Sequence, residues 1–243
     1  MDEVELEAIR KAYRDPLIAP FRLLLHEGTK GVLDKILYDP SFPGATDPSA
    51  LSLLATYLRV RQPARVLELG TYVGFSTLVL ADVLAGNPTP AQLTTVEPSP
   101  IAMEKAKGFV ANAGLASAVH FVLGKSIDPT VLEQLRDRGP FDTIYTDSSH
   151  SYRETLEELN TFCLDPRLSG VSTSFWFHDA GPQAADYDAL HEGGVRRALD
   201  EWRAARGADF QILVLEPPFW PNPTGLAVMC RRVGEKPRER VES

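Results

Sequence analysis

The sequence VLELGTYVGFST, residues 66–77, has the pattern of a buried strand that turns tightly into a helix. Its first four residues have the length and apolar character of a short strand inside a sheet. Gly70 permits a sharp turn out of that strand, and Gly74 lets the next helix begin close to a ligand. Tyr72 stands where a dinucleotide-binding fingerprint has its middle glycine. The stretch therefore predicts a strand–turn–helix unit that binds a ligand, and a tight turn without a ligand is the alternative.

Strands and helices alternate along the chain downstream of this unit. The expected strands are 66–69, 93–96, 119–123, 141–146, 174–177, 210–215 and 225–230, with helices between all but the last two. Such alternation implies parallel pairing in a doubly wound α/β sheet of seven strands. The last two strands are joined only by a proline-rich loop, residues 216–224. A loop of that length makes a hairpin, so the last strand is expected to run antiparallel.

Composition limits the class of protein. The 243 residues are 44% hydrophobic and 24% charged, as in an ordinary globular chain, and the net charge is −8. Such a surface repels phosphate backbones, so no nucleic-acid partner is expected. No apolar run approaches the about 18 residues of a membrane span, and acidic residues stand where a signal peptide has basic ones. We expect a cytoplasmic protein without membrane contact, and Cys163 and Cys230 are too few for a disulfide framework.

The residues that follow each expected strand are candidates for a binding site, because ligands of open α/β sheets bind at the carboxyl ends of the strands. These residues are Gly70, Glu97, Gly124, Lys125, Ser126, Asp147, His178 and Asp179. A carboxylate such as Glu97 can accept hydrogen bonds from both hydroxyls of a ribose. Gly70 and Glu97 together indicate a nucleoside-binding edge, which does not separate a nicotinamide cofactor from S-adenosylmethionine.

Motifs in the right order carry a resemblance to known enzymes. Residues 67–76 resemble the first motif of the catechol and caffeoyl-CoA type O-methyltransferases. Residues 141–152, followed by 177–179 and 194–197, resemble a group that includes macrolide-sugar and cephalosporin-pathway methyltransferases. The resemblance covers roughly residues 60–232. It implies a class I, S-adenosylmethionine-dependent O-methyltransferase with a Rossmann-like sheet.

The resemblance also implies a domain organisation and a reaction. Residues 1–60 are expected to form a helical cap over the substrate and 61–233 the S-adenosylmethionine-binding core. Residues 234–243 have balanced charge and no apolar periodicity, so a flexible tail is expected there from the sequence itself. The expected acceptor is a hydroxyl of a small molecule, such as a phenol or a sugar of specialised metabolism, and the expected assembly is a homo-oligomer.

The resemblance assigns cofactor contacts to Glu68, Gly70, Tyr72, Gly74, Ser76, Glu97, Ser126, Ile127 and Asp147. Within this set Glu97 is expected at the ribose, and Ser126 and Ile127 at the adenine. Tyr72 and Ser76 are expected at the carboxylate or amine of the methionine part, along which Glu68 and Gly70 lie.

A metal and a base are implied by the second group of motifs. Asp147 and Asp179 match acids that bind a divalent metal, Mg²⁺ or Mn²⁺, and His150 falls where the catechol-type enzymes carry a lysine base and the sugar-type ones a histidine. His178 departs from the pattern, since the related enzymes have an acid there. Imidazole is a poorer ligand for Mg²⁺ than for Mn²⁺, Fe²⁺ or Zn²⁺. Either the metal differs, or His178 is not a ligand, or no metal binds; His150 is alternatively a helix cap.

Other functions remain open at this point. The same fold serves N-methyltransferases and enzymes that methylate hydroxylated bases in tRNA. A non-catalytic nucleoside-binding module would keep Gly70 and Glu97 but would need no base, and an NAD-dependent dehydrogenase would bind a different cofactor. The presence of His150 and of two acids after strands favours an enzyme.

Overall fold

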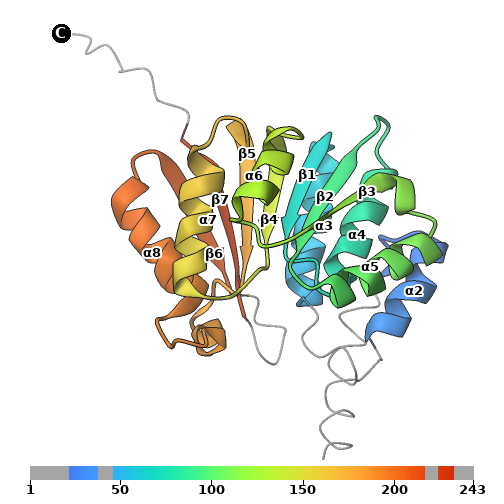
Figure 1. The fold of residues 1–243 in the computed structure, drawn as a ribbon, viewed down its shortest axis with the longest axis horizontal. Coiled ribbons are helices and arrows are strands. Elements are labelled where there is room, and N and C mark those ends of the chain that lie inside the picture. The colour runs from blue at the N-terminus through green and yellow to red at the C-terminus, as the bar shows by residue number, and fades with distance from the viewer. Residues whose placement is uncertain (1–21, 38–45, 217–223, 233–243) are drawn as a thin grey trace, which may run out of the picture.

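The computed structural model describes residues 22–37, 46–216 and 224–232. A single seven-stranded sheet forms its centre, in the order β3-β2-β1-β4-β5-β7-β6 (Figure 1). The strands are β1 (Arg65–Leu69), β2 (Gln92–Glu97), β3 (Val119–Leu123), β4 (Phe141–Thr146), β5 (Ser169–His178), β6 (Phe210–Leu215) and β7 (Leu226–Arg231). β7 runs antiparallel to both β5 and β6, whereas β1 to β5 pair in parallel. The predicted doubly wound sheet with an antiparallel last strand is confirmed.

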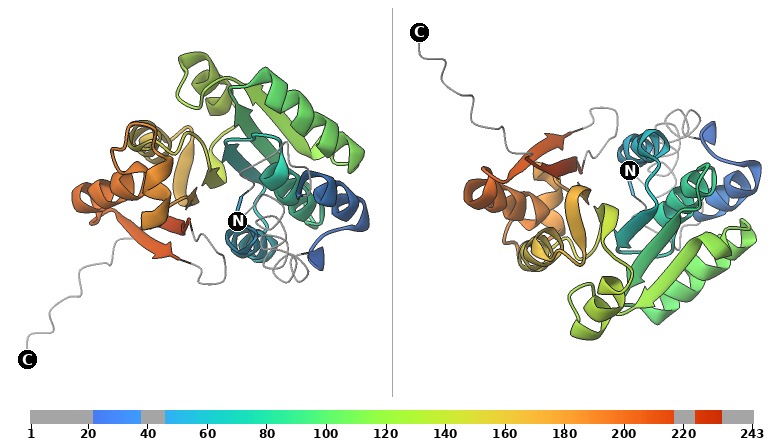
Figure 2. Two further views of the ribbon diagram at one scale, coloured as in Figure 1. Left: turned by 90° about the horizontal axis from the view of Figure 1, so that it is seen from below. Right: turned by 90° about the horizontal axis from the view of Figure 1, so that it is seen from above.

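Helices cover both faces of the sheet (Figure 2). Buried residues of α2 (Glu27–Leu37), α3 (Pro48–Arg61), α4 (Phe75–Ala85) and α5 (Pro100–Asn112) form one apolar cluster. Those of α6 (Pro129–Arg136), α7 (Tyr152–Leu164) and α8 (Gly194–Arg206) form a second one on the opposite face. Two short 3₁₀ helices, η1 (Ala116–Ala118) and η2 (Pro182–Tyr187), lie in connections. The sheet is thus buried on both sides, as its near-continuous apolar strands require.

β5 begins five residues earlier than the sequence predicts. Phe141 pairs with Ser169, and Thr143 then pairs with Ser174, so β5 carries extra residues opposite β4. This irregularity includes Val171, whose side chain is 80% exposed. A strand is recognised in a sequence by the alternation of apolar and polar residues, and this alternation is lost where the β4–β5 pairing is interrupted. The predicted strand is therefore shorter than the observed one.

The described part of the N-terminal sixty residues is helical, as expected. The Asp47 carboxylate accepts a hydrogen bond from the Ser49 amide at 2.7 Å, and Pro48 occupies the first turn of α3. Leu51, Leu54 and Leu58 are buried in the same cluster as Val66 of β1. The helices therefore pack into the core, and a boundary at residue 60 stays a prediction.

Three expectations fall outside the described residues. These are the fold of residues 1–21 and 38–45, the tail 234–243, and most of the proline-rich loop before β7. Among the described helices none is both long and apolar enough to cross a membrane.

Candidate functional site

A cavity of about 620 Å³ lies at the carboxyl ends of the parallel strands. It is lined mainly by the loops that follow β1, β2, β3 and β4. The lining residues are Thr46, Gly70, Thr71, Tyr72, Phe75, Ser76, Val96, Glu97, Pro98, Gly124, Lys125, Ser126, Asp147, Ser148, Ser149, His150 and Glu154. Six of the residues assigned to the cofactor, Gly70, Tyr72, Ser76, Glu97, Ser126 and Asp147, are thereby brought together.

Gly70 is the point at which the loops after β1 and β4 touch. Its φ is +98°, and a Cβ atom there would lie 2.0 Å from the backbone oxygen of Asp147. Only glycine combines this left-handed conformation with so close an approach. The tight turn predicted from the sequence therefore serves to bring the Asp147 loop against the first loop.

Glu97 is held by the backbone at the floor of the cavity. Its Oε2 accepts a hydrogen bond from the Tyr72 amide at 2.7 Å, and its Oε1 accepts one from the Ser99 amide at 2.9 Å. The side chain is buried, yet it lines the cavity. Each oxygen retains a lone pair, so the carboxylate is oriented to accept further hydrogen bonds from a ligand.

Glu68 lies beneath the cavity instead of lining it. Residues alternate between the two faces of a strand, and Glu68 shares with Val66 the face that α4 covers. Its Oε2 accepts hydrogen bonds from Thr77 at 2.5 Å and Thr95 at 2.7 Å. Burial raises its pKa to about 7, although nearby hydroxyl donors oppose the shift. Glu68 thus links β1 to α4 and β2 through hydrogen bonds, and its direct contact with a cofactor stays a prediction.

Gly74 and Ile127 are also absent from the cavity lining among the residues that the structure describes. A Cβ atom on Gly74 would lie 2.8 Å from the Cβ of Ala106 in α5. The glycine therefore permits α4 to start against α5, whereas the sequence predicted close approach to a ligand.

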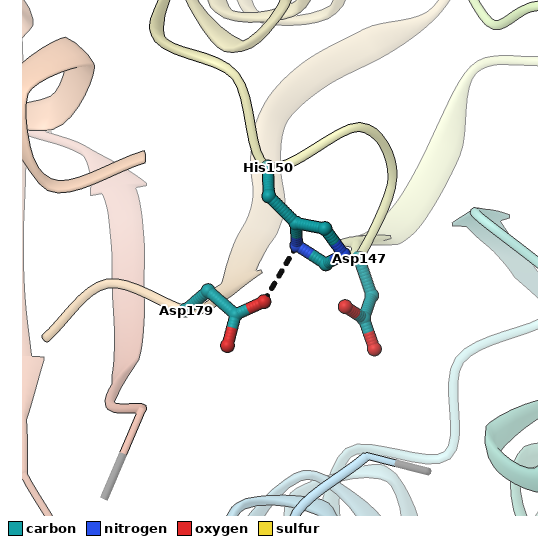
Figure 3. A group of neighbouring side chains, drawn as sticks. All are labelled: Asp147, His150 and Asp179. Atoms are coloured by element: carbon teal, nitrogen blue, oxygen red, sulfur yellow. Dashed lines mark ion pairs between the residues drawn. The ribbon is translucent and has the colours of Figure 1, made fainter. Parts of the chain in front are cut away.

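Asp147, His150 and Asp179 form a compact group beside the cavity (Figure 3). One potential ligand atom from each lies within 4.8 Å of the others. The Nδ1 atom of His150 is 2.6 Å from Oδ2 of Asp179. His150 and Asp179 have φ values of +58° and +57°, which is uncommon for residues other than glycine. Strained backbone of this kind occurs preferentially at functional sites, where surrounding structure maintains it.

Thr46 and Tyr145 orient Asp147. The Thr46 hydroxyl donates to Oδ2 of Asp147 at 2.8 Å, and the Tyr145 hydroxyl donates to the same atom at 3.2 Å. No pattern in the sequence indicates Thr46, which lies 101 positions from its partner. The loop before α3 thus contributes to the site, and a cap over the substrate stays a prediction.

Each charged form in the group is stabilised by its oppositely charged neighbours. Burial alone would raise the pKa of Asp147, but the neighbouring His178 outweighs it and keeps the pKa below its usual value. Burial would lower the pKa of His150, but hydrogen bonding to Asp179 raises it above the usual value. The pKa of Asp179 is lowered because its two histidine neighbours outweigh burial.

His178 lies behind the two acids. Its Nδ1 is 3.1 Å from Asp179 and 3.4 Å from Asp147, and the Asp47 amide donates to its Nε2 at 3.4 Å. A ring that accepts at Nε2 carries its proton on Nδ1, and so does the charged ring. In both forms the nitrogen that faces the acids has no lone pair for a metal. The geometry gives His178 the place of a counter-charge, and its role as a ligand stays a prediction.

Glu158 of α7 is a site residue that the sequence analysis missed. Its buried carboxylate accepts hydrogen bonds from Ser126 at 2.6 Å and from Ser148 at 2.9 Å, and both serines line the cavity. A glutamate inside an amphipathic helix usually faces solvent, so its position in the helix gave no indication of this contact.

Comparisons with known proteins agree with this arrangement. A family described as a methyltransferase domain matches residues 67–180. Catechol O-methyltransferase of Niastella koreensis is 35% identical over 106 residues, which cover 43% of this chain and 46% of that protein. Catechol O-methyltransferase of Mycobacterium tuberculosis is 37% identical over 100 residues, or 40% of each chain. The matched segments thus span less than half the length of these curated relatives.

Solved structures share the fold over nearly the whole chain. An O-methyltransferase of Streptomyces achromogenes involved in tomaymycin synthesis, solved with S-adenosylmethionine, has a TM-score of 0.70 at 20% identity. The likeness covers 96% of this chain and 100% of that one. An O-methyltransferase of Bacillus cereus, solved with S-adenosylhomocysteine, has a TM-score of 0.69 at 17% identity and covers 85% of this chain and 91% of that one. The resemblance stated from the motifs is supported: residues 67–180 match a methyltransferase domain, the curated relatives of this segment are O-methyltransferases, and the chain has the class I fold of O-methyltransferases solved with S-adenosylmethionine or its product.

Proposed function

We propose that this protein transfers a methyl group from S-adenosylmethionine to a hydroxyl of a small molecule, with a divalent cation assisting. One observation carries the proposal: Asp147 and His150, which form a compact group with Asp179, line the same cavity as Glu97. If S-adenosylmethionine binds along this edge with its ribose at Glu97, its sulfonium and methyl group lie near Asp147, His150 and Asp179. The acceptor hydroxyl then lies where a base and two carboxylates converge.

His150 is the proposed base. Methyl transfer needs a deprotonated oxygen close to the methyl carbon, and a hydroxyl is mostly protonated at neutral pH. Asp179 binds Nδ1 of His150 at 2.6 Å, which leaves Nε2 free to take the proton of the acceptor. The ring lies between the two acids (Figure 3), so both carboxylates stabilise the protonated form.

Asp147 and Asp179 are the proposed metal ligands. Two carboxylates with an imidazole beside them fit Mg²⁺ or Mn²⁺, which favour oxygen ligands. A divalent cation, when bound, lowers the pKa of a hydroxyl that coordinates it. Thr46 and Tyr145 hold the Asp147 carboxylate in place by hydrogen bonds to Oδ2, and Oδ1 lies 3.4 Å from Nδ1 of His178.

A phenol is the proposed type of acceptor, in preference to a sugar. Tyr187, whose side chain is 50% exposed, lies edge-on to His150 with 6.1 Å between ring centroids. An exposed aromatic ring beside the base offers a wall on which a flat acceptor packs. The curated relatives named catechol O-methyltransferases support the same class. The homo-oligomeric state, the cytoplasmic location and the absence of a nucleic-acid partner stay predictions.

Replacing Glu97 with alanine is expected to weaken S-adenosylhomocysteine binding about tenfold or more, since each hydrogen bond to a charged group contributes roughly 1.5–3 kcal/mol. Isothermal titration calorimetry measures the effect. Glu104→Ala is the matched control, because Glu104 is exposed on α5, away from the cavity lining, and pairs with a surface lysine, Lys107. An unchanged affinity in Glu97→Ala would contradict the ribose assignment.

Removal of divalent metal is expected to abolish most turnover. The assay follows S-adenosylhomocysteine formation with a catechol-type phenol before and after exhaustive treatment with EDTA. Mg²⁺ or Mn²⁺ should restore activity. Undiminished activity after chelation would show that His150 and its acids work without a metal, while methyl transfer itself would stand.

A further inference from the structure

Glu158 is a buried acid without a cationic partner. It is 2% exposed, and no lysine or arginine among the described residues forms an ion pair with it. Its contacts are two hydroxyls: Ser126 donates to Oε1 at 2.6 Å, and Ser148 donates to Oε1 and Oε2 at 2.9 Å each. A carboxylate buried in this way costs free energy, and the proposed proton and methyl transfers do not use it.

Glu158 determines the direction of the hydrogen bonds that the Ser126 and Ser148 hydroxyls can make. A serine hydroxyl has one proton and two lone pairs. When the proton is donated to Glu158, the oxygen can only accept a hydrogen bond from the cavity that both serines line. Burial raises the pKa of Glu158 to about 7, so this arrangement is complete in mildly alkaline solution, where the carboxylate is charged.

Ser126 lies at one end of the ligand edge. In the sheet, β3 neighbours β2, β2 neighbours β1, and β1 neighbours β4. Ser126 follows β3 and Glu97 ends β2, whereas Asp147 follows β4. A nucleoside with its ribose at Glu97 and its reactive end near Asp147 therefore directs its base towards Ser126.

We propose that Glu158 is a positioning residue that makes Ser126 a hydrogen-bond acceptor for the exocyclic amino group of the bound base. This proposal rests on the proposed function. It assigns to Glu158 the choice of an adenine-type base over a base that carries a carbonyl at the same position. Such a carbonyl would face the Ser126 oxygen without a proton between them, and an unmatched polar pair in a binding site is strongly disfavoured.

The test compares the Kd of S-adenosylhomocysteine with that of S-inosylhomocysteine, which has a carbonyl in place of the amino group. Calorimetry at about pH 8.5 keeps Glu158 charged. We expect the natural protein to prefer the adenosyl ligand by about tenfold or more. In Glu158→Met the Ser126 proton is free to turn to the carbonyl, so the preference should fall by about tenfold. Glu157→Met, at an exposed position of the same helix, should keep the preference.

The ratio of the two affinities separates positioning from a merely structural role, which would weaken both ligands together. The two bases also differ at a ring nitrogen, but that difference is common to all variants. Equal, tight binding of both ligands by the natural protein would overturn the proposal, and so would an unchanged ratio in folded Glu158→Met. If that variant does not fold, Ser126→Ala must lower the ratio, and an unchanged ratio there overturns the proposal. Failure of the natural protein to bind either ligand would instead contradict the proposed function.

Discussion

Replacing Gly70 with alanine is expected to destabilise the protein severely and to abolish cofactor binding. The new Cβ atom would lie 2.0 Å from the backbone oxygen of Asp147, and the φ of +98° is unfavourable for alanine. Left-handed strain of about 1–2 kcal/mol adds to an overpacking cost of about 1–3 kcal/mol or more. For a chain of this size we expect Tm to fall by roughly 10 °C, as measured by calorimetric or circular-dichroism melting.

The matched control is Gly108→Ala in α5. Gly108 has no neighbour within 4 Å of the position that a Cβ would take, and its φ lies outside the left-handed region. Alanine there should raise stability by up to about 1 kcal/mol, because alanine is the better helix former. A Gly70→Ala protein with unchanged Tm and unchanged S-adenosylhomocysteine affinity would show that the loops after β1 and β4 are not in contact.

The fold could be predicted because local rules agreed along the chain. Alternation of strands and helices indicated parallel pairing, and the short connection before β7 required an antiparallel partner. The strand-end rule then placed Gly70, Glu97, Ser126 and Asp147 at one edge, where the structure has them around one cavity. Both the sheet and the position of these four residues could be predicted from the order of the helices and strands and the direction of each strand.

The sequence is uninformative where the face of a strand or a distant partner decides what a residue contacts. Glu68 and Glu97 are both acids of parallel strands, yet Glu68 faces α4 and Glu97 ends its strand at the cavity. No local pattern shows that Thr46 reaches Asp147 or that Glu158 reaches Ser126. Such contacts depend on how loops and helices pack, which the spacing of residues along the chain does not encode.

The roles of the two histidines depend on packing in the same way. The resemblance made His178 a possible metal ligand, because it stands where the related enzymes have an acid. In the structure its ring is buried against both acids, whereas His150 lines the cavity. The left-handed backbone at His150, with φ of +58°, points the ring towards Asp179, and nothing in the sequence indicates that conformation.

Replacing His150 with alanine is expected to lower kcat by about 10²–10⁴, the usual contribution of a positioned general base. S-adenosylhomocysteine affinity should be nearly unchanged, because Glu97 and Gly70 form their part of the cavity without His150. The expectation rests on the 2.6 Å contact between His150 Nδ1 and Asp179, which fixes the ring. Steady-state kinetics with a phenol acceptor and calorimetry on the same preparation measure the two effects.

A competing role for His150 is purely structural, since it directly precedes Ser151, the residue that caps α7. Ser151 itself accepts the hydrogen bond from the Glu154 amide at 3.2 Å, so the cap does not need the imidazole. Its replacement, Ser151→Ala, therefore serves as the control: losing a cap costs about 1 kcal/mol of stability but should leave kcat near that of the natural protein. A folded His150→Ala enzyme that turns over at the natural rate would remove His150 from the proposed mechanism. A Tm measured on each sample separates a direct role in catalysis from a loss of activity through unfolding, because a purely structural role lowers kcat and stability together.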